Sequence, residues 1–383
     1  MINIVAVGDI MPGGLLHGTD KKVVSDAVHE LLEQGDIRVG TLECAIGNEP
    51  VFIEEKMKRY GDVIYAPDTD LKRLVDLRIN LVSLANNHFF DLKETGAQHA
   101  ISMLDELGIQ HCGAGSSIYE AQKPSVFTIG NKRIAFLAFC DYHSYMGWIP
   151  FATENSAGVN PMYDDYVIEE IIKNKKKYDF VVVLAHWGRE HTFETTTWCY
   201  RLARQMVKAG ADLILGSHPH RVQPVISWHN KSIVFSMGNF LFPDRLIAPP
   251  LRSTYYSDKT VDTKVLPVTY KYPSVEEITY KKWPPLARYG MIVSSSISGC
   301  SVKSHSQLTY LGEDNMLDVM EESRTIERAL SKYGFLLKYT PYRFAIYIMR
   351  KIVSGRRAMK RALLELNPVH KKHQGGATMG SIK

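Results

Sequence analysis

The sequence has few cysteines and no long apolar segment. Its 383 residues include five cysteines, which are scattered and form no Cys-x-x-Cys pair. An odd number of scattered cysteines argues against a disulfide framework and is typical of a reducing compartment. No run of about 18 apolar residues occurs, so no transmembrane helix is expected. The first residues, MINIVAVGD, lack the basic and long apolar segments of a signal peptide.

The positive charge is concentrated near the C-terminus. The net charge is +5, but residues 341–373 hold nine Lys and Arg against one Glu, so the other residues together are negative. Apolar residues recur at helical spacing in this segment, which indicates a basic amphipathic helix. Such a helix either lies on an anionic membrane surface or docks on the main domain with its basic face in solvent. Few aromatic residues interleave with the basic ones, so no nucleic acid is expected as a partner.

Short apolar runs alternate with amphipathic stretches along the chain. The runs predict strands at Ile2–Val7, Ile37–Leu42, Leu81–Ala85, Ile134–Phe139, Phe180–Ala185, Leu213–Leu215 and Ile233–Ser236. The amphipathic stretches predict helices near Val23–Glu33, Thr69–Leu77, Glu94–Leu107, Tyr163–Lys177 and Thr197–Ala209. This alternation predicts an α/β fold in which helices flank a sheet.

The pattern changes near Pro249. We predict an irregular insertion over about 250–285, rich in Tyr, Pro, Lys and Thr, followed by a closing β-hairpin. The main domain is therefore predicted at 1–313, a helical basic extension at 314–370 and a disordered tail at 371–383. Because long insertions often shape a nearby site, the 250–285 segment is a candidate cover for the ligand cleft.

Polar side chains of metal-ligand type directly follow six of the apolar runs. They are Asp9, Glu43, Asn87 with His88, His186, His218 with His220, and Asn239. Ligands of open α/β sheets bind outside the carboxyl ends of the strands, so these side chains are expected to converge. One histidine after a strand is more often a hydrogen-bonding residue, so the prediction rests on the six together. Imidazole with carboxylate suits a divalent ion such as Zn, Mn or Fe.

Six motifs occur in the order seen in one protein family. They are GDIM, TLECAI, ANNHFFD, AHWGREH, AGADLILGSHPHRVQPV and FSMGNFLF. Over roughly residues 1–313 they resemble the CapA, or poly-γ-glutamate capsule biosynthesis, family, which is similar to the calcineurin-like metallophosphoesterases. The resemblance implies an α/β fold, a metallophosphoesterase-like two-sheet αββα sandwich, here with a C-terminal helical extension. It also implies a site for one or two divalent metal ions.

The same resemblance implies roles for individual residues. The metal ligands would be Asp9, Glu43, Asn87, His186, His218 and His220. Asp9 and His220 would serve the first ion, His186 and His218 the second, and Glu43 would stand where metallophosphoesterases have a bridging aspartate. His88 matches a catalytic histidine that protonates the leaving group. Met11 replaces the histidine of the usual Asp-x-His motif, a departure that the CapA family shares and that allows a mononuclear site.

Two more residues belong to the candidate catalytic set. Asp91 either orients His88 or caps the helix that follows. Arg189 either binds an anionic group of the substrate with both arms of its guanidinium or forms a surface pair with Glu190.

Two functions follow from the sequence. The first is a metal-dependent hydrolase of a phosphoester or a γ-glutamyl amide, linked to capsule or poly-γ-glutamate-type polymer metabolism, with an anionic substrate or polymer as partner. The second is a non-catalytic accessory protein of an extracellular polymer biosynthesis machine. Many family members carry an N-terminal membrane anchor that is not seen here. We therefore expect a cytoplasmic protein, either free or held at the membrane surface through residues 341–373.

Overall fold

A computed structural model describes residues 1–48, 64–141, 149–248, 270–271, 279–320 and 324–339. The chain divides into two compact units, 1–320 and 321–383. The described part of the second unit is the helix α8 (Arg324–Tyr339). The predicted basic helix at 341–373, the predicted tail at 371–383 and most of the predicted insertion at 250–285 lie outside the described residues. The predicted domain boundaries stay predictions.

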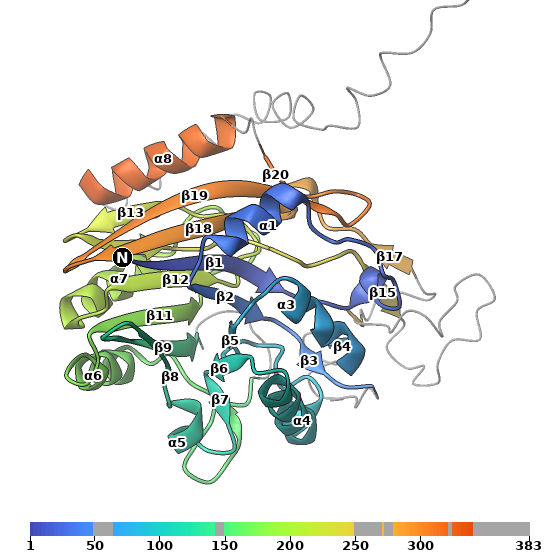
Figure 1. Cartoon of the computed structure of the whole chain (residues 1–383), viewed down its shortest axis with the longest axis horizontal. Coiled ribbons are helices and arrows are strands. Elements are labelled where there is room, and N and C mark those ends of the chain that lie inside the picture. The colour runs from blue at the N-terminus through green and yellow to red at the C-terminus, as the bar shows by residue number, and fades with distance from the viewer. Residues whose placement is uncertain (49–63, 142–148, 249–269, 272–278, 321–323, 340–383) are drawn as a thin grey trace, which may run out of the picture. The chain divides into compact units, whose positions relative to one another are not determined.

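The first sheet has seven strands with both parallel and antiparallel pairs (Figure 1). Its order is β20 (Leu317–Val319), β19 (Ser301–Leu311), β18 (Tyr289–Ser298), β1 (Ile2–Ile10), β2 (Ile37–Leu42), β5 (Leu81–Ser83) and β6 (Gln110–Cys112). Strands β1, β2, β5 and β6 run parallel. The hairpin of β18 and β19 pairs antiparallel with β1, so the last part of the first unit lies beside its first strand.

The second sheet has six strands. Its order is β13 (Val225–Trp228), β14 (Lys231–Val234), β12 (Leu213–Ser217), β11 (Phe180–His186), β9 (Lys132–Cys140) and β8 (Ser125–Ile129). The four central strands run parallel, and the two edge strands pair antiparallel. Every residue of β11 is buried. Its unbroken apolar run is therefore the pattern expected of a strand that is covered on both faces.

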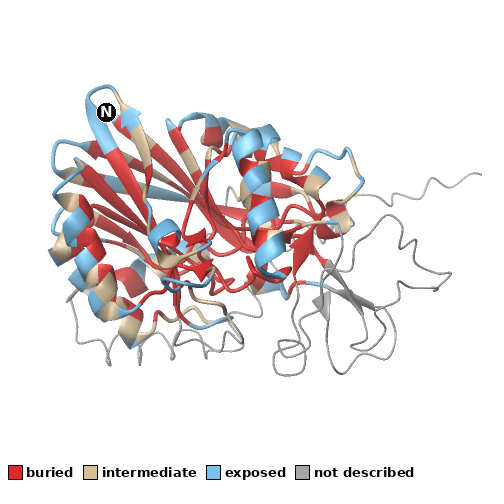
Figure 2. Ribbon diagram, turned by 90° about the horizontal axis from the view of Figure 1, so that it is seen from below, coloured by how far each residue is buried: buried red, intermediate tan, exposed pale blue. Residues whose placement is uncertain are grey.

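Helices cover the sheets. α6 (Asp164–Lys175) packs on β9 and β11, α4 (Lys93–Glu106) on β6, and α1 (Asp26–Glu33) on β20. Figure 2 shows that the strands are mostly buried, whereas the helices expose one side. The expected fold class, an α/β two-sheet sandwich with flanking helices, is confirmed. In the described part of the chain, no helix combines the length and apolar character needed to span a bilayer.

Further elements, most of them short, complete the first unit. The helical ones are η1 (Gly14–Leu16), η2 (Asp68–Leu71), α3 (Lys72–Asp76), α5 (Ile118–Ala121), α7 (Thr197–Ala209) and η3 (Pro285–Ala287). The extended ones are β3 (Ala45–Ile46), β4 (Tyr65–Ala66), β7 (Ala114–Gly115), β10 (Gly158–Val159), β15 (Arg245–Ala248), β16 (Tyr270–Lys271) and β17 (Thr279–Lys281).

The helix α7 shows how local sequence sets an element. The hydroxyl of Thr196 accepts a hydrogen bond from the backbone N–H of Cys199, and so caps the first turn. Gly210 ends the helix with a φ of +119°, a conformation that favours glycine. The buried residues recur at helical spacing, at Cys199, Leu202, Ala203, Met206 and Val207. Both ends of this helix agree with the prediction from sequence.

The chain after β14 crosses from the second sheet to the first. The N–H of Met237 donates to the carbonyl of Gly216, and the N–H of Asp9 donates to the carbonyl of Gly238. Gly8 allows this approach, since a Cβ at that position would lie 1.8 Å from the carbonyl oxygen of Gly238. The Thr41 hydroxyl also donates to the Ser217 hydroxyl at 3.0 Å. These contacts hold the carboxyl ends of the two sheets together.

Candidate metal centre

The carboxyl ends of both sheets meet at a buried cluster of polar side chains. It contains all six predicted metal ligands, each at most 7% exposed: Asp9, Glu43, Asn87, His186, His218 and His220. Asp9 comes from β1 and Glu43 directly follows β2, whereas His186 ends β11 and His218 follows β12. The first sheet therefore supplies the carboxylates, and the second sheet supplies the imidazoles.

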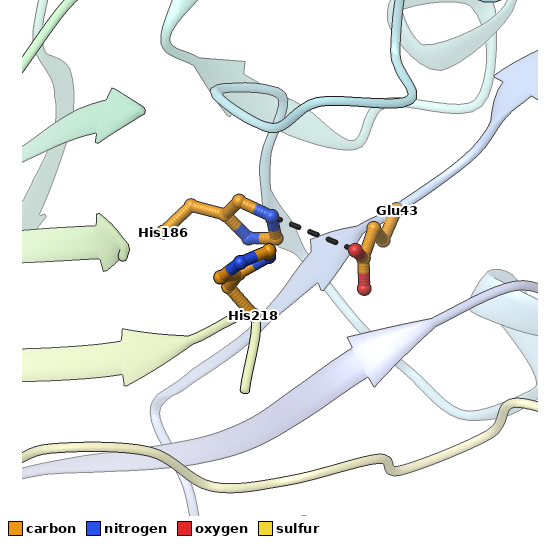
Figure 3. Close-up of side chains that lie close together, drawn as sticks. All are labelled: Glu43, His186 and His218. Atoms are coloured by element: carbon orange, nitrogen blue, oxygen red, sulfur yellow. Dashed lines mark ion pairs between the residues drawn. The ribbon is translucent and has the colours of Figure 1, made fainter. Parts of the chain in front are cut away.

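Within the cluster, ligand-type atoms form two groups of three. One atom each of Glu43, His186 and His218 lie within 4.8 Å of one another, as do atoms of Asp9, Glu43 and His220. Figure 3 shows the first group, in which Nε2 of His186 is 3.5 Å from Oε1 of Glu43. Glu43 belongs to both groups. The group of Glu43, His186 and His218 contains the ligands implied for the second ion, and the group of Asp9, Glu43 and His220 contains those implied for the first. Metal binding itself stays a prediction.

The atoms of this cluster fit a divalent cation. Among the residues that the structure describes, neither ring nitrogen of His218 has a hydrogen-bond partner, and Oδ1 of Asp9 also lacks one. Buried polar atoms are normally hydrogen-bonded, so unsatisfied ones call for a ligand. Imidazole nitrogens and carboxylate oxygens together are the donor set that Zn, Mn and Fe ions take in proteins. A proton could satisfy one such atom, whereas a cation satisfies several together.

Burial sets the charge state of three members. It raises the pKa of Asp9 to about 7. It lowers the pKa of His218 to about 3 and the pKa of His186 well below its ordinary value. Both imidazoles are therefore neutral at physiological pH, which is the form that binds a metal ion. Asp9 must lose its proton before it can act as a ligand.

Neighbouring polar groups orient two of the imidazoles. Nδ1 of His186 is 2.9 Å from the Ser217 hydroxyl, and its Nε2 is 2.8 Å from Oδ1 of Asn87. Nδ1 of His220 is 2.8 Å from Oδ1 of Asn239. These contacts fix both rings, and each ring turns Nε2 toward Glu43. Such outer contacts are the usual means by which proteins orient histidine ligands.

The turn that carries His218 and His220 has an unusual backbone. Their φ angles are +93° and +50°, in the left-handed region that residues other than glycine rarely adopt. The N–H of His218 donates to Oδ2 of Asp9 at 3.2 Å, which holds the turn against β1. Strained backbone of this kind gathers at functional sites, where the surrounding structure maintains it.

His88 and Asp91 form a buried pair beside the cluster. Nδ1 of His88 is 2.7 Å from Oδ2 of Asp91, and the same oxygen accepts a hydrogen bond from the N–H of Ile64. The helix α4 begins at Lys93 with no side-chain cap. Of the two roles predicted for Asp91, its contacts are those of a residue that orients His88.

Arg189 lies apart from these contacts. Its side chain is exposed. Both roles predicted for Arg189 therefore stay predictions.

Two contributors were missed at the sequence level. Ser217 orients His186, and Asn86 ties two strand ends together, because its side chain donates to the Leu42 carbonyl and accepts from the N–H of His88. Both precede a predicted ligand directly, in the motifs ANNH and GSHPH. This position next to a ligand could have indicated a role in the site. The indication is weak, because serine and asparagine are common in turns.

A cavity of about 790 Å³ lies at the opposite ends of the strands, lined by residues such as Ile2, Phe180 and Lys231. The ammonium groups of Lys175 and Lys231 lie 2.6 Å and 2.5 Å from the buried carboxylate of Asp212. Lys132 pairs with Asp179 at 2.8 Å. Each of these ammonium groups already faces a carboxylate, so the charges in the cavity lining form structural ion pairs. The cavity contains none of the residues of the metal cluster.

Comparison with known proteins agrees with the motifs. The family model described as bacterial capsule synthesis protein PGA_cap matches residues 3–244. The PGA biosynthesis protein CapA of Bacillus subtilis is 31% identical over 243 residues, which are 62% of each chain. A probable polyglutamine synthesis accessory protein of Mycobacterium tuberculosis, Rv0574c, is 26% identical over 214 residues, 53% of this chain and 55% of that protein. The chain thus spans about three fifths of the length of the CapA relatives it matches.

Among solved structures, the NAD nucleotidase NadN of Haemophilus influenzae is similar over 94% of this chain and 60% of its own. Its sequence identity is 10% and its TM-score 0.39, which is too low to carry an argument about function. The family match covers more than half of the chain and all six residues of the cluster. The chain therefore belongs to the bacterial capsule synthesis protein family PGA_cap, as the resemblance to CapA implied.

Proposed function

We propose that this protein is a metal-dependent hydrolase that serves capsule or poly-γ-glutamate-type polymer metabolism. The observation that carries the proposal is the pair of buried ligand groups that share Glu43. The link to the polymer comes from the names of the CapA relatives. Two half-sites around one carboxylate are what a two-metal hydrolytic centre needs.

The cluster would hold one or two Zn, Mn or Fe ions. The ligands would be Asp9, Glu43, Asn87, His186, His218 and His220. A bound ion of this kind supplies a Lewis acid and activates water near neutral pH. The chain's own contribution is to hold the ligands from two sheets in fixed positions and to keep them buried.

His88 supplies the proton in this proposal. The carboxylate of Asp91 can only accept a hydrogen bond, so Nδ1 of His88 carries the hydrogen and Nε2 is the nitrogen that exchanges a proton with the leaving group. The negative charge of Asp91 stabilises the imidazolium form of His88. This pair is therefore a general acid held in one orientation.

The substrate class is an anionic phosphoester or an anionic γ-glutamyl polymer. The proposal also retains a cytoplasmic location, with contact to the membrane surface through residues 341–373.

The test is the metal content of protein purified without chelators. We expect about one or two equivalents of Zn, Mn or Fe in the wild type, and loss of that metal in His218→Ala and His220→Ala. His305→Ala is the matched control, because His305 is exposed on β19, outside the cluster. Metal-bearing protein would then be screened against phosphoesters and γ-glutamyl peptides.

The second candidate is a non-catalytic accessory role in polymer synthesis. The name of the mycobacterial relative, an accessory protein, favours it. A folded wild type that takes up no metal even after reloading would reject the hydrolase and leave this candidate.

A further inference from the structure

Arg221 directly follows the last histidine of the cluster and is buried. Its exposed fraction is 6%. Arginine is almost never buried unless its charge is paired, because removing an ion from water is costly. Burial lowers its pKa to about 10, which still leaves it protonated at neutral pH. The fold therefore keeps a cation in its interior beside the candidate metal centre.

Few partners satisfy this cation. Nη1 of Arg221 donates to the carbonyl oxygen of His220 at 2.8 Å. Among the residues that the structure describes, it has no further hydrogen bond and no carboxylate within ion-pair distance. A guanidinium has five N–H donors, so most of its capacity is unused.

Arg288 is a buried arginine of this fold whose charge is paired. It is 3% exposed, and its Nη2 lies 2.7 Å and 2.5 Å from the two oxygens of Asp244. Its Nη1 donates to the carbonyls of Leu311 and Gly312. Arg288 is thus neutralised by a carboxylate, whereas Arg221, at similar burial, is not.

The position of Arg221 joins it to the cluster. The carbonyl that it contacts belongs to His220, whose Nε2 is 3.7 Å from Oε1 of Glu43. We propose that Arg221 forms an oxyanion subsite beside the metal cluster and binds a phosphate or carboxylate group of the substrate. This rests on the proposed function, and it assigns the anion-binding role to a buried arginine instead of the exposed Arg189. A planar guanidinium can bind either oxyanion through two parallel hydrogen bonds.

The test measures binding, not turnover. Inorganic phosphate and γ-glutamylglutamate are titrated into wild type, Arg221→Gln, Arg221→Lys and the control Arg78→Gln, each with metal and after chelation. Arg78 is exposed and precedes β5, at the end of that strand away from the cluster. We expect Arg221→Gln to raise the dissociation constant at least about tenfold, since a charge-assisted bond is lost. Arg221→Lys keeps the charge but not the planar pair of N–H donors, so its dissociation constant should lie between those of wild type and Arg221→Gln. Arg78→Gln should match the wild type. The probe that responds identifies the oxyanion.

Two controls separate the possible failures. Thermal melting and metal content should match the wild type in Arg221→Gln, and Arg221→Lys carries the test where the glutamine variant does not fold. Equal affinity of wild type and both Arg221 variants for the probes, or no binding of either probe by the wild type, would overturn the subsite. Absence of metal from the wild type would reject the proposed hydrolase alone, because binding to the chelated protein still reports on Arg221.

Discussion

The buried carboxylate of Asp9 has two opposite effects on stability. Burial raises its pKa to about 7, so the folded state binds this proton more tightly than the unfolded chain does. Below the pKa of the unfolded chain, this proton makes its full contribution to the stability of the folded state. That contribution is lost as the pH rises through 7. In metal-free protein at pH 8, the ionised Asp9 therefore destabilises the folded state by about 4 kcal/mol, since each pKa unit is worth about 1.4 kcal/mol. A bound cation would reverse the sign, because it favours the ionised form.

Asp9→Asn separates these two effects. With a chelator at pH 8, we expect the variant to melt at a higher temperature than the wild type, since an amide carries no charge to bury. At pH 5 this advantage should shrink, because Asp9 of the wild type is then protonated. With metal at pH 8 the order should invert. Thermal unfolding under the three conditions checks this, and an order that stays the same in all three would contradict it.

The pair of His88 and Asp91 makes a second prediction at the residue scale. Asp91→Asn should lower kcat/KM by about 10- to 100-fold, because the amide no longer fixes the ring or stabilises the imidazolium. His88→Ala should cost about 10²- to 10⁴-fold. Metal content should stay at the wild-type level in both, since neither residue belongs to the two ligand groups.

Asp105→Asn is the matched control for that pair. Asp105 also accepts from a histidine, His111, at 3.1 Å, but its side chain is 69% exposed and it belongs to neither ligand group. Its loss should leave kcat/KM unchanged. A fall in metal content with Asp91→Asn would instead make Asp91 part of the metal site.

At the scale of elements, nine of the thirteen strands in the two large sheets could be predicted, whereas the outer strands β6, β8, β13 and β20 were not. The errors in the predicted bounds have a physical cause. β1 was expected to end at Val7 but runs to Ile10, since the buried Asp9 pairs with Asn239, a contact distant in sequence. A strand was expected to continue to Ser236, whereas β14 ends at Val234, where the chain crosses to the first sheet. Periodicity shows which residues are buried but not which sheet buries them.

The site was predictable for a related reason. Carboxyl ends of parallel strands gather at one edge, so the polar residues that follow the apolar runs were expected to converge. The resemblance to the CapA family then implied which six of them are ligands, and five of these six form the two groups of three. Arg221 could not be named, because arginine is usually exposed and only the fold shows that this one lacks a carboxylate. Arg189, in contrast, could be named as a candidate because it lies three residues after His186, yet its side chain is exposed.

The crossing after β14 makes a prediction for Gly8. A Cβ there would lie 1.8 Å from the carbonyl oxygen of Gly238, so Gly8→Ala must push the crossing segment away from β1. We expect a loss of more than about 2 kcal/mol of stability and weaker metal binding, as Asn239 and Asp9 separate. Gly130→Ala is the control, because its Cβ meets nothing within 4 Å and only its φ of +60° is unfavourable, at about 1 kcal/mol. Denaturant unfolding and metal titration of both variants decide it.

At the scale of the whole first unit, the cluster joins the two sheets of the sandwich. Asp9 and Glu43 follow strands of the first sheet, and His186 and His218 follow strands of the second. A bound cation would therefore connect the sheets at the edge where Gly8 and Gly238 already bring them close. Removal of the cation should weaken the contacts between the two sheets more than the hydrogen bonds within each sheet.

Chelation should therefore destabilise the folded protein. A ligand that binds only the folded state at a hundred times its dissociation constant stabilises it by about 2.7 kcal/mol, and removal by a chelator should lower the melting temperature accordingly. His218→Ala should melt at the same temperature with and without metal, whereas His305→Ala should respond like the wild type. Hydrogen exchange would locate the change, with faster exchange expected at the N–H groups of Asp9, Met237 and His218, which bridge the sheets. Exchange that accelerates evenly over both sheets would show that the cation stabilises the unit without connecting its two halves.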